Sequence, residues 1–91
     1  MSVNVRIPTQ LRTLTGGAGE VAIEGSTVGE VLKALDAAHP GLGERLFDED
    51  GKLRRFVNVF VADEDVRFLD GLGTAVAAGQ TVSIVPAVAG G

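Results

Sequence analysis

Two stretches near the start of the chain alternate apolar and polar residues with the two-residue period of a half-buried strand. The first covers residues 3–7 and ends at Pro8, and the second covers residues 20–24. Residues 9–15 follow neither a strand nor a helix period, and the glycine-rich stretch 16–19 predicts a turn. The pattern therefore predicts an N-terminal hairpin with a long connection.

The period changes from two to that of a helix after Gly25. The predicted N-cap is Thr27, whose hydroxyl would accept from the Glu30 amide while Glu30 reaches back, as in a capping box. The helix should stop at residues 39–41, His-Pro-Gly. Gly29 lies inside it and needs support from packing. The apolar residues at i, i+3, i+4 and i+7 are Val28, Val31, Leu32 and Leu35.

The second half of the chain has its clearest strand pattern at residues 54–61. Val57, Val59 and Val61 share one face, which we expect to meet the helix, so Phe60 would lie on the open face of the sheet. An exposed aromatic residue there would mark a partner surface. The alternative is that loops cover it.

The remaining segments are shorter. We expect a helical turn at 42–46, a polar loop at 48–52 and a turn at 62–65. A short strand is predicted at 66–68 and an irregular crossover at 69–78. The last strand should cover residues 81–85, with Val82 and Ile84 facing inward and regular pairing stopping at Pro86, which has no amide hydrogen.

The order of elements is strand, strand, helix, strand, short strand, strand. It predicts an α+β fold, a single-domain β-grasp (ubiquitin-like) roll over residues 1–91 with a mixed sheet and one main helix. In this roll the first and last strands are parallel central neighbours. Residues 87–91 would form a flexible tail.

Composition narrows the function. The 91 residues carry a formal net charge of −4, which argues against nucleic acid or an anionic membrane as partner and favours a basic protein surface. There is no cysteine and one histidine, so thiolate catalysis, disulfides and a histidine-based metal centre are not expected. The first residues lack the apolar run of a signal peptide, so we expect a cytoplasmic protein, and we expect it to be a monomer.

The C-terminal residues are the best candidates for chemistry. After Pro86 come small or modest apolar residues, including Val88 and Ala89, and then Gly90 and Gly91. Residues 87–91 reach about 16 Å when extended, and glycine lets the backbone enter a narrow channel. A tail of this kind suits a carboxylate, that of Gly91, on which another protein acts. The alternative is an inert end.

Three stretches of the sequence, residues 55–61, 65–68 and 82–91, resemble the MoaD/ThiS family of ubiquitin-like sulfur carriers, and the resemblance extends over essentially the whole chain. The similarity points to the branch of the family that serves cysteine biosynthesis. Many members of the molybdopterin branch have Pro-Pro where this chain has Pro86-Ala87, and Asp-Gly-Asp where it has Ala78-Gly79-Gln80.

The resemblance implies a role for the tail and a set of partners. An adenylyltransferase/sulfurtransferase of the MoeB/MoeZ type, using ATP and Mg²⁺, would adenylate Gly91, which would then become a thiocarboxylate. A pyridoxal-phosphate cysteine synthase of the CysM type would accept the sulfur, and a zinc metalloprotease would release cysteine. The chain itself would be no enzyme and would bind no cofactor or metal. Pro86, Val88, Ala89 and Gly90 would present Gly91, and Phe60 and Val85 would dock the partner.

Other functions stay open at this stage. The chain could be the small subunit of molybdopterin synthase or the thiamin sulfur carrier. It could be a ubiquitin-like modifier joined to lysines of other proteins through Gly91. It could also be a β-grasp binding module whose tail takes no part in chemistry.

Overall fold

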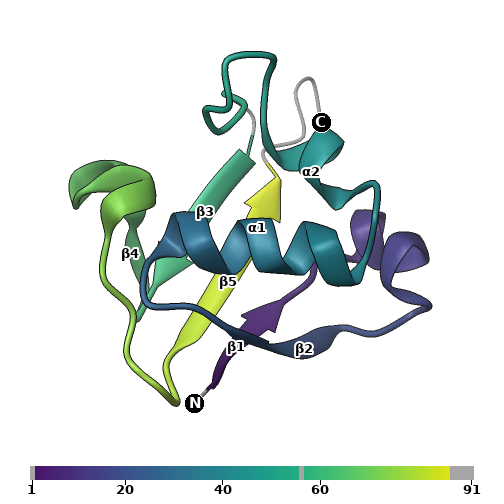
Figure 1. The fold of residues 1–91 in the computed structure, drawn as a ribbon, viewed down its shortest axis with the longest axis horizontal. Coiled ribbons are helices and arrows are strands. Elements are labelled where there is room, and N and C mark those ends of the chain that lie inside the picture. The colour runs from purple at the N-terminus through teal and green to yellow at the C-terminus, as the bar shows by residue number, and fades with distance from the viewer. Residues whose placement is uncertain (1, 56, 87–91) are drawn as a thin grey trace.

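The computed structural model describes residues 2–55 and 57–86 (Figure 1). One five-stranded sheet is covered on one face by helices. The elements in chain order are β1 (Ser2–Arg6), η1 (Thr9–Thr15), β2 (Glu20–Glu24), α1 (Val28–Ala38), α2 (Leu42–Leu46), β3 (Val57–Val61), β4 (Glu64–Asp65), η2 (Val66–Phe68), η3 (Gly71–Gly73) and β5 (Thr81–Pro86), where η marks a 3₁₀ helix.

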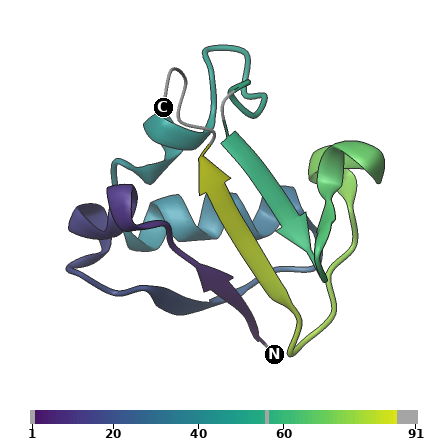
Figure 2. The ribbon, with the colours of Figure 1, turned by 180° about the vertical axis from the view of Figure 1, so that it is seen from behind.

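The strand order across the sheet is β2-β1-β5-β3-β4. β1 pairs antiparallel with β2 and parallel with β5, and β5 pairs antiparallel with β3 (Figure 2). The first and last strands are therefore parallel neighbours in the centre of a mixed sheet. The predicted α+β architecture is confirmed, and β2 has the bounds that the alternation predicted.

The core lies between the sheet and α1. All four residues of the predicted apolar stripe of α1 are buried, and so are Val57, Val59 and Val61 of β3. Gly29 lets α1 approach the crossover, because a Cβ atom there would lie 3.1 Å from the Leu72 carbonyl oxygen. This contact supplies the packing that a glycine inside a helix requires.

The start of α1 is capped largely as predicted. The Thr27 Oγ1 accepts from the Glu30 amide at 3.2 Å. The Glu30 carboxylate reaches one residue beyond the cap, and accepts from the Ser26 amide at 2.9 Å and the Ser26 hydroxyl at 2.6 Å. These hydrogen bonds from Ser26, the hydroxyl first, lower the pKa of Glu30 below its ordinary value.

The segment after β3 differs from the prediction. The expected turn at 62–65 is reduced to Ala62 and Asp63, both with positive φ (52° and 69°), as in a two-residue hairpin turn. Residues 64–65 then form β4, and the predicted strand at 66–68 is the 3₁₀ helix η2. The physical reason is a local cap, since Asp65 Oδ1 accepts from the Arg67 amide at 2.8 Å and bends the chain.

Other boundaries also differ, and β1 covers Ser2–Arg6 where residues 3–7 were predicted. Residues 9–15, which followed no period, form η1, and the strand predicted at 54–61 begins only at Val57. Before it, the Arg54 amide donates to the Leu46 carbonyl at 2.9 Å, so residue 54 is tied to α2 and not to the sheet. Phe56 lies outside the described residues.

Candidate functional site

The candidate site is the end of β5, where the described chain reaches Pro86. Val85 lies opposite Asn58 of β3, and Pro86 lies opposite Val57. β5 runs one residue beyond the predicted 81–85 and includes Pro86, and the residues after it lie outside the described part of the chain, so the stop of the pairing at Pro86 stays a prediction.

The register explains how a proline fits there. The carbonyl of Gln80 accepts from the Asn4 amide of β1 at 2.9 Å, so the backbone polar groups of residue 80 point toward β1. Successive residues of a strand direct their backbone groups to opposite sides, so Pro86 also faces the β1 side and needs no amide hydrogen for the β3 ladder. The carbonyl of Val57, the residue opposite Pro86 on β3, accepts a hydrogen bond from Arg67 Nη2 at 2.8 Å.

On the β1 side, β5 loses its partner before it ends. The parallel pairing stops at Arg6 opposite Ser83, and Pro8 follows two residues later. A surface hollow lies there, lined by Arg6, Arg12 and Val85 among other residues. The last residues of β5 are thus supported by β3 alone, and one side of this strand end is open.

Arg67 holds the β3 side of this site. Its Nη1 donates to Asn58 Oδ1 at 2.6 Å, and its Nη2 donates to the carbonyls of Arg54 at 2.9 Å and Val57 at 2.8 Å. One guanidinium fork therefore fixes both the chain entering β3 and the side chain opposite Val85. Sequence reasoning missed this role, since the hydrogen bonds depend on the turn at 62–63 that places η2 beside β3.

The two predicted docking residues lie on the open face of the sheet. Val85 is 45% exposed, whereas Phe60 is half-buried, opposite Ser83 on one side and Asp65 on the other. Phe68, predicted to lie on a strand, is 86% exposed in η2. The most exposed aromatic side chain of the described residues is thus not the one that the alternation singled out.

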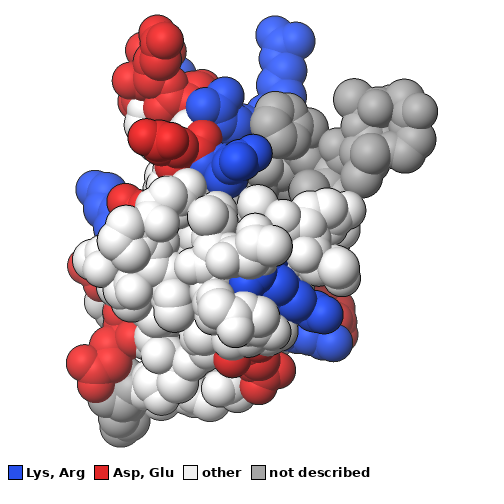
Figure 3. All heavy atoms as spheres, turned by 90° about the vertical axis from the view of Figure 1, so that its right-hand side faces the viewer, with Lys and Arg blue, Asp and Glu red and all other residues white. Residues whose placement is uncertain are grey.

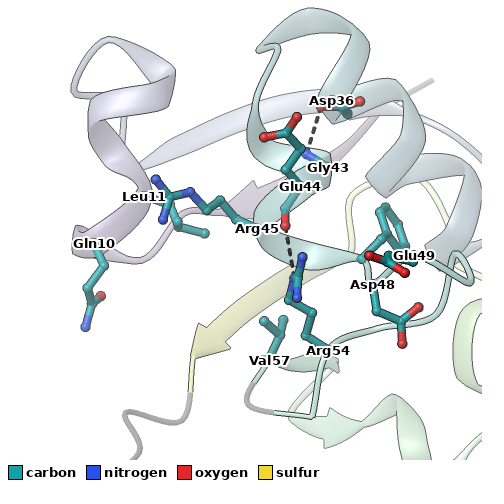
Figure 4. Close-up of a pocket in the computed structure, with 11 residues that line it drawn as sticks. Gln10, Leu11, Asp36, Gly43, Glu44, Arg45, Asp48, Glu49, Arg54 and Val57 are labelled. Carbon is teal, nitrogen blue, oxygen red and sulfur yellow. Dashed lines mark hydrogen bonds between the residues drawn. The ribbon is translucent and has the colours of Figure 1, made fainter.

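A second hollow lies between η1, α2 and the start of β3 (Figure 4). Gln10, Arg45, Arg54 and Val57 line it on the side nearest β5, and Asp48 and Glu49 lie on the other side. Arg54 Nε donates to the Glu44 carbonyl at 2.9 Å, which holds the guanidinium group along this wall.

The other predicted site residues are in the tail. Val88, Ala89, Gly90 and Gly91 lie outside the described residues, so their roles stay predictions. Within residues 2–55 and 57–86, no group of three or more His, Asp or Glu side chains could hold a metal ion. No helix in the same part of the chain is long and apolar enough to cross a membrane.

Comparisons with known proteins agree with this architecture. Residues 5–91 match the ThiS family. The chain is 55% identical to the sulfur carrier protein CysO of Mycobacterium tuberculosis over 93 residues, 100% of each chain. It superposes on the crystal structure of the Amycolatopsis orientalis BexX/CysO complex with a TM-score of 0.91 and 52% identity, covering 98% of this chain and 99% of that one.

A further relative is named as a protein modifier and not as a sulfur carrier. Small archaeal modifier protein 3 of Haloferax volcanii is 47% identical to this chain over 66 residues, which are 72% of this chain and 71% of the relative.

Proposed function

This chain belongs to the ThiS family and is a sulfur carrier of cysteine biosynthesis, and we propose that it carries sulfur on the carboxyl group of Gly91. The full-length similarity to sulfur carrier proteins is the observation that supports this most strongly. The fold adds a physical reason: β5 lies between β1 and β3 and stays paired with β3 up to Pro86, so residues 87–91 follow directly after a strand of the sheet.

The chemistry begins with activation. A carboxylate is a poor electrophile until one oxygen becomes part of a leaving group. The Gly91 carboxylate attacks the α-phosphorus of ATP, releases pyrophosphate and becomes an acyl-adenylate. A persulfide sulfur then displaces AMP, and a second thiol reduces the resulting acyl disulfide. The product is a thiocarboxylate, a sulfur nucleophile at neutral pH, and a carrier without cysteine cannot lose that sulfur to an internal disulfide.

The other steps belong to partner proteins. A CysO protein occurs in complex with another protein, BexX, in one of the similar structures. For this chain we propose an adenylyltransferase/sulfurtransferase that uses ATP and Mg²⁺, a pyridoxal-phosphate cysteine synthase and a zinc metalloprotease. This chain supplies the tail and the surface around its base.

A protein modifier is the second candidate, and the similarity to small archaeal modifier protein 3 favours keeping it. Both functions begin with an adenylated Gly91, so they differ only in what accepts the acyl group. A modifier becomes joined to lysine amines of other proteins, whereas the carrier delivers sulfur and is recovered as a free chain.

Intact mass spectrometry of the chain purified from its native cell, with metal chelators present, tests the proposal. We expect a thiocarboxylate form and a form longer by one cysteine, because a thioester formed on an aminoacrylate rearranges to the more stable amide. Recovery of lysine conjugates alone would instead establish the modifier. A bare carboxylate as the only form would contradict both the cysteine carrier and the modifier, and is the form that a molybdopterin or thiamin carrier returns to.

A further inference from the structure

The positive charges of this acidic protein are concentrated at one end. Seven of the eight Lys and Arg residues lie on or beside the elements that surround the end of β5, and the exception is Lys33 on α1. Figure 3 shows Lys and Arg groups along the upper edge and the right flank of one side of the molecule. The seven residues are Arg6, Arg12, Arg45, Lys52, Arg54, Arg55 and Arg67.

The acidic residues are divided differently. Six of the twelve, among them the loop residues Asp48, Glu49 and Asp50, lie at the same end, so the two signs nearly balance there. The other six lie toward the β3–β4 turn, the start of α1 and the crossover, where Lys33 is the one cation. By this division the end opposite the tail carries a formal charge of −5 and the tail end +1, which together give the net charge of −4. The six are Glu24, Glu30, Asp63, Glu64, Asp65 and Asp70.

The arginines nearest the tail are held in place by neutral acceptors. Arg12 Nε donates to the Ile7 carbonyl at 3.0 Å, Arg54 Nε to the Glu44 carbonyl at 2.9 Å, and Arg67 to backbone carbonyls and Asn58. A carbonyl fixes a guanidinium group without cancelling its charge. The backbone thus orients these cations, and they keep a positive field at the surface.

The cations flank Val85 and Pro86 on both sides. Arg6 and Arg12 line the hollow on the β1 side together with Val85. On the β3 side, Arg67 bonds the chain opposite Val85 and Pro86, and Arg54 and Arg55 lie just before β3. We call these five arginines (Arg6, Arg12, Arg54, Arg55 and Arg67) the basic patch.

We propose that the basic patch docks on an acidic surface of the protein that activates Gly91, around the mouth of the channel that receives the tail. This inference rests on the proposed function and adds the sign of the partner surface. It reverses the expectation from the net charge, which favours a basic partner. The distribution of charge over the surface matters more than the net charge here, because charges act over about 10 Å or less at physiological ionic strength.

Distance separates this surface from the nucleotide site. Residues 87–91 reach about 16 Å when extended, so the reacting carboxyl lies far from the basic patch once the tail is inserted. The patch therefore meets the protein surface at the channel mouth, and ATP phosphates bind elsewhere.

The test compares charge reversals at the two ends of the molecule. Arg55→Glu changes an exposed cation of the patch, and Lys33→Glu makes the same change of net charge on the outer side of α1. The adenylyltransferase of the same cell is the probe, with association rates and ATP–pyrophosphate exchange measured at several salt concentrations. A milder variant, Arg6→Gln, removes charge without placing an acid opposite Glu20.

We expect Arg55→Glu to raise the KM for the carrier about tenfold through slower association, and to weaken its salt dependence. Lys33→Glu should leave the KM and its salt dependence near the wild-type values. Arg6→Gln should change them in the same direction as Arg55→Glu, but less strongly. Equal effects of Arg55→Glu and Lys33→Glu, or faster association of Arg55→Glu, would overturn the inference. If the wild-type chain binds the adenylyltransferase but supports no ATP–pyrophosphate exchange, the proposed function fails. The association rates of the variants would still show whether the partner's docking surface is acidic.

Discussion

The two ends of the sheet are built for different purposes. At the far end, the crossover is bonded to the rest of the fold by backbone groups: the Val28 amide donates to Thr74, Val76 to Ser26 and Gly79 to Ser2, at 2.9–3.0 Å. At the tail end, β5 has β3 alone beside its last residues, and one arginine side chain holds that segment. The far end fixes the fold, and the tail end presents a strand terminus with an open side.

The difference between the two ends predicts that fold and activity can be separated. Deleting Gly90 and Gly91 should abolish adenylation, because the reacting carboxyl no longer reaches the nucleotide. The melting temperature should stay within a few degrees of the wild type, about the shift that 1 kcal/mol would cause. The deletion should leave stability nearly unchanged because every residue of the described hydrophobic core lies from Val3 to Ile84. Pyrophosphate exchange and thermal unfolding measure the two effects.

A control for this deletion lies at the far end. A Cβ atom at Gly73 would meet no atom within 4 Å, and its φ is not positive, so Gly73→Ala should leave both activity and stability unchanged. Residual adenylation of the truncated chain would mean that Gly91 is not the acceptor of AMP.

The next largest effect should come from Arg67→Ala. Its lost hydrogen bonds are partly exposed, so we expect a stability loss of about 1–2 kcal/mol, within the range of a few ordinary hydrogen bonds. We also expect about a tenfold lower kcat/KM for adenylation, because the strand opposite Val85 and Pro86 is no longer fixed. Denaturant unfolding and steady-state kinetics measure these changes.

Arg67→Lys separates positioning from charge. A lysine keeps the positive charge but lacks the planar fork that reaches Asn58 and the two carbonyls. If Arg67 positions the site, the Arg67→Lys variant should resemble the alanine variant in amide hydrogen exchange at Asn58 and Val85. Full rescue by lysine would assign Arg67 to the charge of the basic patch alone.

The contrast between Arg67 and the strands shows what the sequence could predict. Alternation predicted β1 to within one residue at each end, β2 and the inward valines of β3, since burial of one sheet face leaves a period of two. The parallel pair at the centre was predicted from the order of elements, which indicated the β-grasp roll. Alternation could not predict η2. Residues two apart in a strand share a face, whereas Val66 is buried and Phe68 exposed, because the Asp65 cap and the positive φ of Ala62 and Asp63 decide the backbone.

The sequence offered candidate residues for the site, whose roles stay predictions, but not their surroundings. The terminal glycines and Val85 follow from sequence and resemblance alone. The basic patch needed the fold, because Arg6, Arg54 and Arg67 are distant in sequence and meet only through the register of β1, β5 and β3. Net charge, which averages over both ends, favours the opposite sign from the partner surface that we propose.

Two phenylalanines test the open face with a smaller expected effect. Phe60→Ala should weaken binding of the adenylyltransferase by about 1–3 kcal/mol, as loss of an interface anchor does. Since Phe60 is half-buried, its cost to stability should be below the ~3–5 kcal/mol of a fully buried phenylalanine. Titration calorimetry and denaturant unfolding give both values.

Phe68→Ala is the matched control, because Phe68 is 86% exposed beyond the β4 edge. It should change neither stability nor binding by more than about 0.5 kcal/mol. Loss of binding in this variant would extend the docking surface to η2.

The smallest effect should appear at the far end, in acid. The pKa of Glu30 is lowered by its hydrogen bonds from Ser26, so the folded state binds a proton at Glu30 less readily than the unfolded state. A carboxyl of this kind contributes stability that is present above its unfolded pKa, near the ordinary value of 4.5, and is lost as pH falls through the lower folded pKa. Wild type should therefore lose more stability than Glu30→Gln between about pH 5 and pH 3. The two unfolding curves, measured at each pH, should converge toward the acid side. Adenylation at neutral pH should be the same for both, since α1 begins at the end away from the tail, and a slower reaction of Glu30→Gln would show that the two ends are coupled.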